Sequence, residues 1–455
     1  MQPFYCMKRI YIYLLIIFSF SFLTLCKAFA VEDVKTAENV TDKNELIFDN
    51  VIKKSIENSY DIQMADFDIL IAKYGINEAK AEYMPRIGLS VGTEYNKSFK
   101  DSQLASITVG DTFINPYTRY QTMGGITLNY NLFDFGVRSS MLKMAKEDVT
   151  FKTLMEKDDA RKVQMTVIDL YGRLYILYEQ IKLKKDILAL EESSLHMKKR
   201  LYRAKEISLI ELKEQSAKVE KTKKDLTGLY GLLEENLAGL SFFTCEDYDA
   251  KKVVVHEMTP TDYEYSENVD FQNLTIAKIY DSAHKKKEFE LFAAKRTNYP
   301  KINLYTKYYM YGSDRDNYGG TFSDFGASNW AIGASASMVP FDGGKNRSKV
   351  KKLELELKKI EIEKKKSIAE IKKQIYTLGA NLNANNHQLT ASNEMVKDLS
   401  EKESATEKMC TNRLISPVEL NNAKVMLLEE KIENLKYKTF VVAIKRSLEV
   451  LTNTN

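Results

Sequence analysis

The sequence offers few residues whose types and spacing could support catalysis or metal binding. Its four histidines are scattered: His196, His256, His284 and His387. None has partners at the spacing of a zinc or other metal site. Residues 343–346 read Gly-Gly-Lys-Asn, but a phosphate-binding loop would need glycine at Val339 and a hydroxyl at Asn346. No nucleophile elbow or dinucleotide fingerprint is present. We therefore expect no catalytic, cofactor-binding or metal-binding residue, and a protein that is not an enzyme.

The first 30 residues have the pattern of a secretory signal peptide. Lys8 and Arg9 precede a largely apolar run, and Ala28 and Ala30 are small residues at the two positions that a signal peptidase reads. We expect export, with cleavage after Ala30.

Cysteine placement bears on both lipidation and disulfides. Cys26 raises the alternative of a lipoprotein, but Leu25 is bulky for the residue before a lipidated cysteine. Cleavage after residue 30 leaves Cys245 and Cys410, which the helical hairpins expected below hold far apart. We expect both to be free thiols.

Composition and charge exclude several classes of protein. Aromatic residues at 11% and apolar residues at 44% exclude a disordered chain. The formal charge of +4 includes three basic residues of the signal peptide, so the mature chain is close to neutral, which argues against nucleic acid as a partner. After residue 30 no run of 18 apolar residues occurs. Contact with a membrane would therefore have to involve strands.

The chain repeats itself at long range. Three pairs of short segments recur in the same order: 84–87 with 299–302, 132–136 with 340–344, and 207–212 with 415–420. The last two pairs are both separated by 208 residues. This order predicts an internal duplication.

Each half reads as a helix, two strands joined by a loop, a very long helix, a turn and a further helix. The first repeat, 31–245, has expected helices over 45–83, 137–206 and 208–245 and strands over 86–97 and 121–133. The second, 268–455, has helices over 268–298, 345–413 and 417–451 and strands over 301–311 and 328–339. An equatorial segment, 246–267, joins the repeats, and its pattern indicates no clear role.

The two long helices carry heptad seams. In the first, the apolar positions alternate in steps of three and four and skip Lys184. At 1.5 Å per residue each helix would be about 100 Å long, so it cannot lie in a globular core. Each can instead lie beside two shorter helices stacked end to end. The seam alone favours an ordinary coiled coil.

The four strands alternate apolar and polar residues over about ten positions, the length of a tilted membrane-spanning strand. A soluble sheet with one face on a core is the alternative. The connections 96–121 and 312–329 are polar, as expected of outward loops. Four strands cannot close a barrel, because about eight is the practical minimum. Copies must therefore pool their strands, two giving eight and three giving twelve.

With a proline at each helix-to-strand join, a Phe-Asp turn into each long helix and an acid after each hairpin turn, the chain resembles the TolC family of outer-membrane efflux proteins. The resemblance extends from about Glu45 to Leu451. It implies a mainly helical fold with transmembrane β-structure: a trimeric, twelve-stranded outer-membrane barrel continued by a twelve-helix periplasmic barrel, with an internal two-fold repeat. It implies a location in the outer membrane, extending into the periplasm.

The resemblance also assigns residues. The implied gate lies at the periplasmic hairpin tips: Ile207, Ser208, Glu211, Ile415, Ser416, Glu419 and Asn422. Arg203, Lys205 and Arg413 are nearby candidates for pairing with the two acids. The family's glycine before the tip turn is not evident, and Pro417 departs from the pattern. The residues at the helix–strand junctions have structural roles: Pro85, Asp134, Gly136, Pro300, Pro340, Phe341, Asp342 and Gly343.

The implied function is an exit duct that passively conducts substrates from a periplasm-spanning efflux or type I secretion complex and is gated at the tips. Its implied partners are two further copies of the chain, a periplasmic adaptor, an inner-membrane pump or ATP-driven transporter, and outer-membrane lipid. The alternative is a periplasmic coiled-coil adaptor or scaffold without a pore. Nothing in the sequence identifies the cargo.

Overall fold

The computed structural model describes residues 45–95, 107–109, 112–114, 120–264, 269–314, 316–323 and 325–452. The signal peptide expected over 1–30 and most of the connection 96–121 lie outside these residues. No described helix is long and apolar enough to cross a membrane.

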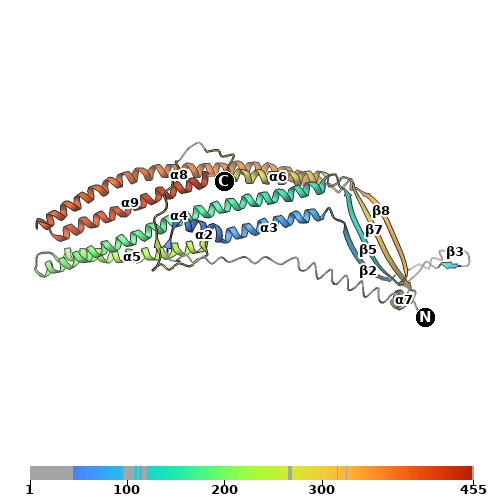
Figure 1. The fold of residues 1–455 in the computed structure, drawn as a ribbon, viewed down its shortest axis with the longest axis horizontal. Coiled ribbons are helices and arrows are strands. Elements are labelled where there is room, and N and C mark those ends of the chain that lie inside the picture. The colour runs from blue at the N-terminus through green and yellow to red at the C-terminus, as the bar shows by residue number, and fades with distance from the viewer. Residues whose placement is uncertain are drawn as a thin grey trace. The chain divides into compact units, whose positions relative to one another are not determined.

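Two long helical hairpins make up much of the described chain. Helices α4 (Val137–Arg203) and α8 (Lys345–Thr411) each have 67 residues. Each is followed, after a short turn, by a 36-residue helix: α5 (Leu209–Thr244) follows α4, and α9 (Pro417–Thr452) follows α8. In Figure 1 the hairpins run side by side, and α9 contacts both α8 and α4.

The remaining helices and strands are shorter. The helices are α2 (Phe48–Asn58), α3 (Tyr60–Ala81), α6 (Thr275–Arg296) and α7 (Tyr318–Ser323). The strands are β1 (Glu45–Leu46), β2 (Arg86–Tyr95), β3 (Ile107–Val109), β4 (Thr112–Ile114), β5 (Tyr120–Phe133), β6 (Val254–Val255), β7 (Lys301–Asp314) and β8 (Ala327–Ser337).

Four of the strands form one antiparallel sheet in the order β2-β5-β7-β8. Its register places the apolar residues of all four strands on one face: Leu89 pairs with Ile126, Ile126 with Tyr308, and Tyr308 with Trp330. Because side chains alternate along a strand, the polar residues gather on the opposite face. The sheet therefore has an apolar and a polar side.

The helices follow the strands in the same order. Helix α3 leads into β2, β5 leads into α4, α6 leads into β7, and β8 leads into α8. The contacting helix pairs are α3 with α4, α4 with α6, and α6 with α8. Sheet and helices thus form one continuous layer, with β2 and α3 at one edge and β8 and α8 at the other (Figure 1).

The single helix expected over 45–83 is wrong, because the chain breaks at Ser59. Ser59 has an extended backbone (φ −57°, ψ 134°) that separates α2 from α3. The break lets α2 pack on α4 and α5, while α3 continues along α4. The first two residues of the expected helix instead form β1, which pairs in parallel with β6.

The helix expected over 268–298 begins later, at Thr275. The Asp270 side chain accepts hydrogen bonds from the Gln272 amide (3.1 Å) and from Asn273 Nδ2 (2.7 Å). Such local side-chain bonds compete with helix formation. Leu274 has an extended backbone and precedes the first helical residue.

The short helices stack end to end beside α4. The rings of Tyr60 in α3 and Phe242 in α5 make an edge contact at 6.2 Å. Cys245, which follows α5, donates its thiol proton to the carbonyl of Asn58 at 3.1 Å. Cys245 and Cys410 are both free.

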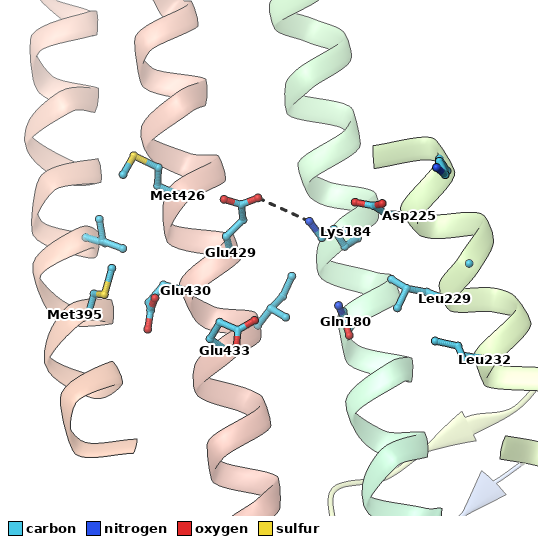
Figure 2. A pocket seen from close by; sticks show the side chains of 14 residues that line it. Gln180, Lys184, Asp225, Leu229, Leu232, Met395, Met426, Glu429, Glu430 and Glu433 are labelled. Atoms are coloured by element: carbon cyan, nitrogen blue, oxygen red, sulfur yellow. Dashed lines mark ion pairs between the residues drawn. The ribbon is translucent and has the colours of Figure 1, made fainter. Parts of the chain in front are cut away.

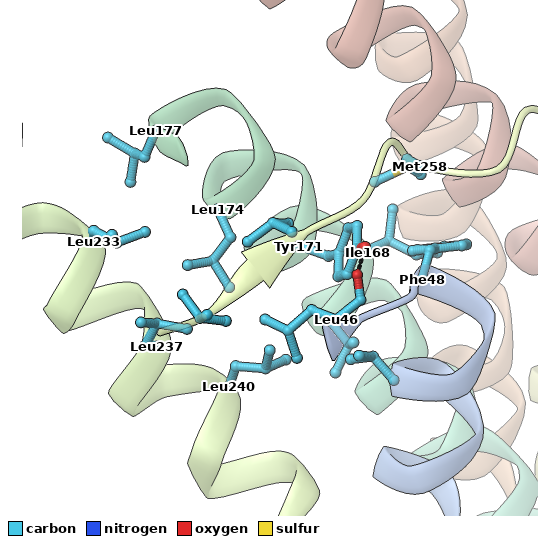
Figure 3. Packing of buried hydrophobic residues seen from close by; sticks show 14 of the residues in the cluster. Leu46, Phe48, Ile168, Tyr171, Leu174, Leu177, Leu233, Leu237, Leu240 and Met258 are labelled. Atoms are coloured by element: carbon cyan, nitrogen blue, oxygen red, sulfur yellow. Dashed lines mark hydrogen bonds between the residues drawn. The ribbon is translucent and has the colours of Figure 1, made fainter. Parts of the chain in front are cut away.

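The principal apolar core lies where this stack crosses the middle of α4. Tyr171 is fully buried there with Leu174, against Leu240 of α5 and Phe48 of α2 (Figure 3). The Tyr171 hydroxyl lies 2.7 Å from the carbonyl oxygen of Leu46 and 2.9 Å from that of His256.

The Tyr171 hydroxyl links α4 to β1 and to the residue that follows β6. Burial raises the pKa of Tyr171 far above its usual range, so the hydroxyl keeps the proton that it donates. The sequence pattern indicated no role for the equatorial segment. In the structure this segment contributes β6, and its His256 carbonyl forms a hydrogen bond with Tyr171 in the middle of α4.

We predict that Tyr171→Phe lowers the free energy of unfolding by about 1–3 kcal/mol, because the carbonyls of Leu46 and His256 lose the hydroxyl proton that they share. It should also speed limited proteolysis of 246–264. Tyr175→Phe is the matched control, since burial raises the Tyr175 pKa to about 12 but its hydroxyl bonds to no described residue. Equal unfolding curves and cleavage rates for the two variants would contradict the assignment.

Candidate functional site

The two hairpin turns have the same backbone conformation. Lys205 (φ 63°) and Arg413 (φ 61°) both lie in the left-handed region. In each turn, the amide of the following residue donates to the carbonyl five residues earlier: Glu206 to Leu201 and Leu414 to Met409, both at 2.9 Å. This is a Schellman helix end, in which glycine is usual at the left-handed position. Lysine and arginine occupy the place where the resemblance implied a glycine.

A serine caps the returning helix in each turn. The Glu211 amide donates to Ser208 Oγ at 3.3 Å, and the Ser208 amide donates back to the Glu211 carboxylate at 3.4 Å, which makes a capping box. The Glu419 amide donates to Ser416 Oγ at 3.3 Å. Pro417 is the first residue of α9, a position where its missing N–H costs nothing.

The structure does not bring the tip acids to the basic residues nearby. Among the described residues, neither Glu211 nor Glu419 forms an ion pair with Arg203, Lys205 or Arg413. Both acids are exposed. The Glu211 carboxylate instead bonds within its own cap, including to Ser208 Oγ at 3.1 Å.

Apolar side chains at the tips are exposed, which sequence reasoning missed. Ile210 is 71% exposed and Leu414 is 70% exposed. Of the predicted tip residues, Ile207 and Ile415 are half-buried and Asn422 is exposed. The sequence signal for this surface was the apolar Ile210 in the first turn of α5 and the apolar Leu414 shortly before the cap residue Ser416. The tips therefore offer apolar surface beside two carboxylates.

Polar contacts hold each hairpin together. In the first, Lys223 of α5 pairs with Glu192 of α4 at 3.0 Å, and the hydrogen bond to this carboxylate raises the pKa of Lys223. In the second, Lys424 of α9 lies 3.6 Å from Glu403 and 3.5 Å from Glu407 of α8.

Between the hairpins, toward the tips, the described residues show two polar links. Asn421 of α9 donates to Ser194 Oγ at 3.0 Å and to the Leu190 carbonyl at 3.3 Å, both on α4. Lys184 of α4 pairs with Glu429 of α9 at 3.7 Å (Figure 2). Lys184 is the residue that interrupts the heptad seam, and that interruption is the sequence signal for this contact.

A groove of about 910 Å³ separates the hairpins beside the Lys184–Glu429 pair (Figure 2). Its apolar lining includes Leu229 and Leu232 of α5 and Met395 of α8. Side chains therefore do not fill the space between the hairpins at this height.

The helix–strand junctions also match each other. Asp134 accepts from the amides of Gly136 (3.2 Å) and Arg138 (3.0 Å). Asp342 accepts from those of Gly344 (3.1 Å) and Asn346 (2.9 Å). The residues that follow the two aspartates have positive φ: Phe135 (55°), Gly136 (86°), Gly343 (70°) and Gly344 (85°). Each aspartate thus fixes a tight turn at the start of a long helix.

The remaining junction residues end helices or strands. Pro85 and Pro300 directly precede β2 and β7, and Pro340 follows β8. Phe341 is 83% exposed. These positions lie where the chain passes between strand and helix.

The comparisons with known proteins agree with this architecture. Residues 51–244 match the family model described as outer membrane efflux protein. Over these residues the chain is similar to that family. The TolC-family resemblance inferred from the sequence is confirmed. The predicted location, the outer membrane with extension into the periplasm, is also confirmed. No curated protein matches the chain by sequence.

Solved structures share the fold at low identity. The structure of CusC, which is described in terms of folding and transmembrane channel formation, has a TM-score of 0.73 to this chain. The two sequences are 15% identical, and the match covers 92% of this chain and 95% of that chain. The outer membrane protein VceC from Vibrio cholerae is 14% identical, with a TM-score of 0.71 over 89% and 96%. The Campylobacter jejuni CmeC outer membrane channel is 13% identical, with a TM-score of 0.73 over 94% and 92%.

We predict that Lys205→Gly makes the first hairpin turn more stable than Lys205→Ala by about 1 kcal/mol, because only glycine adopts positive φ without steric cost. Hydrogen exchange of the amides over 200–212 measures the difference. Exchange at equal rates in the two variants would show that the left-handed turn is not present in solution. The pair Lys199→Gly and Lys199→Ala, inside α4, serves as control and should give the opposite order.

Proposed function

We propose that three copies of this chain form an outer-membrane channel that passively conducts substrates out of a periplasm-spanning export complex and is gated at the hairpin tips. The observation that carries the proposal is the continuous layer of strands and helices with an open edge on each side. An open sheet edge in lipid leaves backbone groups unsatisfied at several kcal/mol each.

Strand direction supports a ring. Neighbouring strands in β2-β5-β7-β8 are antiparallel, so the edge strands β2 and β8 run in opposite directions. If β8 of one copy lies beside β2 of the next, the antiparallel pattern continues without a break. Repeating this contact closes a head-to-tail ring. The resemblance to the TolC family supports three copies, and hence twelve strands.

The helical edges are suited to the same contact. Along α3, apolar side chains recur on one exposed face: Tyr60, Met64, Phe67, Ile71 and Tyr74. Along α8, Leu355, Ile362 and Tyr376 are exposed at heptad spacing. Exposed apolar faces of this length in both edge helices favour helix-to-helix packing between copies.

Charge supports the same pairing. Helix α3 carries four acids and two lysines. Residues 345–376 of α8 carry twelve Lys and Arg residues and five Glu residues. Packing α3 of one copy beside α8 of the next brings unlike net charges together, whereas packing α8 on α8 would bring like charges together.

The gate is assigned to relative movement of the two hairpins. Each hairpin is held internally by charged pairs, while Asn421 and the Lys184–Glu429 pair join one hairpin to the other beside an incompletely filled groove. Separating the hairpins would break these links and widen the tunnel at the tips. Glu211 and Glu419, exposed at the tips, would favour the entry of cations.

The exposed Ile210 and Leu414 provide apolar surface on which a periplasmic adaptor docks. The adaptor joins the channel to an inner-membrane pump or ATP-driven transporter, which supplies the energy. The duct itself then needs no catalytic residue.

Reconstitution of the mature protein into planar bilayers tests the function. We predict discrete single-channel currents, and a higher mean conductance for the double variant Lys184→Ala with Asn421→Ala, because both links between the hairpins are lost. Lys182→Ala is the matched control, since Lys182 pairs with Glu179 at the same distance of 3.7 Å but within α4.

Two outcomes count against the proposal. A mature protein that stays soluble and monomeric, and gives no current, would favour the adaptor or scaffold alternative. Equal currents in the double variant and in the control would show that these two links do not control opening, although the protein still forms a channel.

A further inference from the structure

The polar face of the sheet carries a lysine at mid-height. Lys307 lies near the middle of β7, the 14-residue strand Lys301–Asp314. In the register it pairs with Thr127 of β5 and Ala331 of β8, and Thr127 pairs with Gly88 of β2. The adjacent row, from Leu89 to Trp330, is apolar and lies on the opposite face.

The side on which Lys307 lies follows from the cost of burying a charge. A lysine that faced lipid at the bilayer midplane would cost about 2–4 kcal/mol. The apolar row faces lipid at no such cost. In the proposed barrel Lys307 therefore faces the aqueous lumen, and three copies place three lysines at one height.

Aromatic side chains hold Lys307 in place along the strand. The Lys307 ammonium lies 4.9 Å from the ring centre of Tyr305, two residues away on the same face. Tyr305 in turn lies over Gly333 of β8, where an added Cβ would be 2.6 Å from the tyrosine hydroxyl. Tyr309, on the other side of Lys307, lies over Gly125 of β5. The two glycines leave room for the rings to lie against the sheet.

No acid of the described chain neutralises Lys307. Among the described residues Lys307 makes no ion pair. The same-face positions around it on the neighbouring strands carry Arg86, Ser90, Gly125, Asn129, Asn329 and Gly333. The described acid of β2, Glu94, shares this face but lies six residues beyond Gly88, which at about 3.3 Å per residue is about 20 Å along the strand.

We propose that Lys307 forms a ring of positive charge inside the membrane-spanning part of the channel, and that this ring favours the passage of anions. Rings of lysine or arginine are a general means by which pores select anions. The inference rests on the proposed function. It assigns to the membrane-spanning segment a preference for small inorganic and organic anions, opposite in sign to that of the acids at the hairpin tips.

The test measures reversal potentials in planar bilayers under a potassium chloride gradient at about 0.01 M salt, where the Debye length is about 30 Å. Lys307→Gln should lower the ratio of chloride to potassium permeability by about threefold or more, and Lys307→Glu should lower it further. Lys307→Arg keeps the charge and should match the unchanged chain. Lys251→Gln, which changes an exposed lysine of the equatorial segment, is the control for loss of positive charge outside the sheet.

Chemical modification of a cysteine at position 307 changes the charge after the channel has folded, so this test does not depend on whether the Lys307→Glu variant folds. Lys307→Cys is made in a chain whose two free cysteines, Cys245 and Cys410, are changed to serine. A cationic methanethiosulfonate reagent should restore the original permeability ratio in open channels, and an anionic one should shift it toward potassium. The reagent forms a mixed disulfide with the introduced thiolate and releases a sulfinate.

The outcomes separate the two proposals. Channels whose permeability ratio is the same for the Lys307→Gln, Lys307→Glu and Lys307→Arg variants, or the same after either reagent, overturn the lysine ring and leave the channel intact. Absence of any current from the unchanged chain overturns the proposed function and the ring with it.

Discussion

The need to satisfy backbone hydrogen bonds at the two edges of one sheet governs the rest of the structure. Strands β2 and β8 are the edges of the four-stranded sheet in the described chain. Water can satisfy their free N–H and C=O groups, but lipid cannot. One sheet thus combines an apolar face that suits lipid with edges that do not, and the proposed association of copies would pair those edges. The helices extend the same edges, since α3 leads into β2 and α8 follows β8.

Turn chemistry sets where the layer changes from strand to helix and where each hairpin reverses. Asp134 and Asp342, separated by 208 residues, make equivalent bonds to the backbone at the start of α4 and α8. Lys205 and Arg413, with the same separation, share a left-handed conformation at the tips. These agreements support the internal duplication that the sequence suggested. They also give the two long helices equal lengths, so the hairpins end at matched turns.

Features encoded locally were the ones that the sequence predicted well. Alternation placed the residues from Leu89 to Trp330 on one apolar face, because side-chain direction depends only on position in a strand. The break at Ser59 was missed because it accompanies the packing of α2 on α4 and α5, helices that lie far from α2 in the sequence. The later start of α6 follows from a side-chain turn at Asp270 that competes with helix.

At the candidate gate, the sequence indicated which residues lie at the tips but not the contacts that they make. The resemblance indicated the two serines and the two acids at the tips, and the structure shows that the serines cap α5 and α9. Arg203, Lys205 and Arg413 were candidates for pairing with the two acids, and no such ion pair is seen among the described residues. The interrupted heptad seam indicated Lys184 but not its partner, because the Lys184–Glu429 link depends on how one hairpin lies against the other. The left-handed turns at Lys205 and Arg413 lack the glycine that usually signals them.

Electron microscopy of the mature protein extracted in detergent tests the central claim most directly. We expect particles with three-fold symmetry, in which β8 of each copy lies beside β2 of the next and twelve strands close a barrel. Monomeric particles, or an assembly that leaves β2 and β8 unpaired, would contradict it.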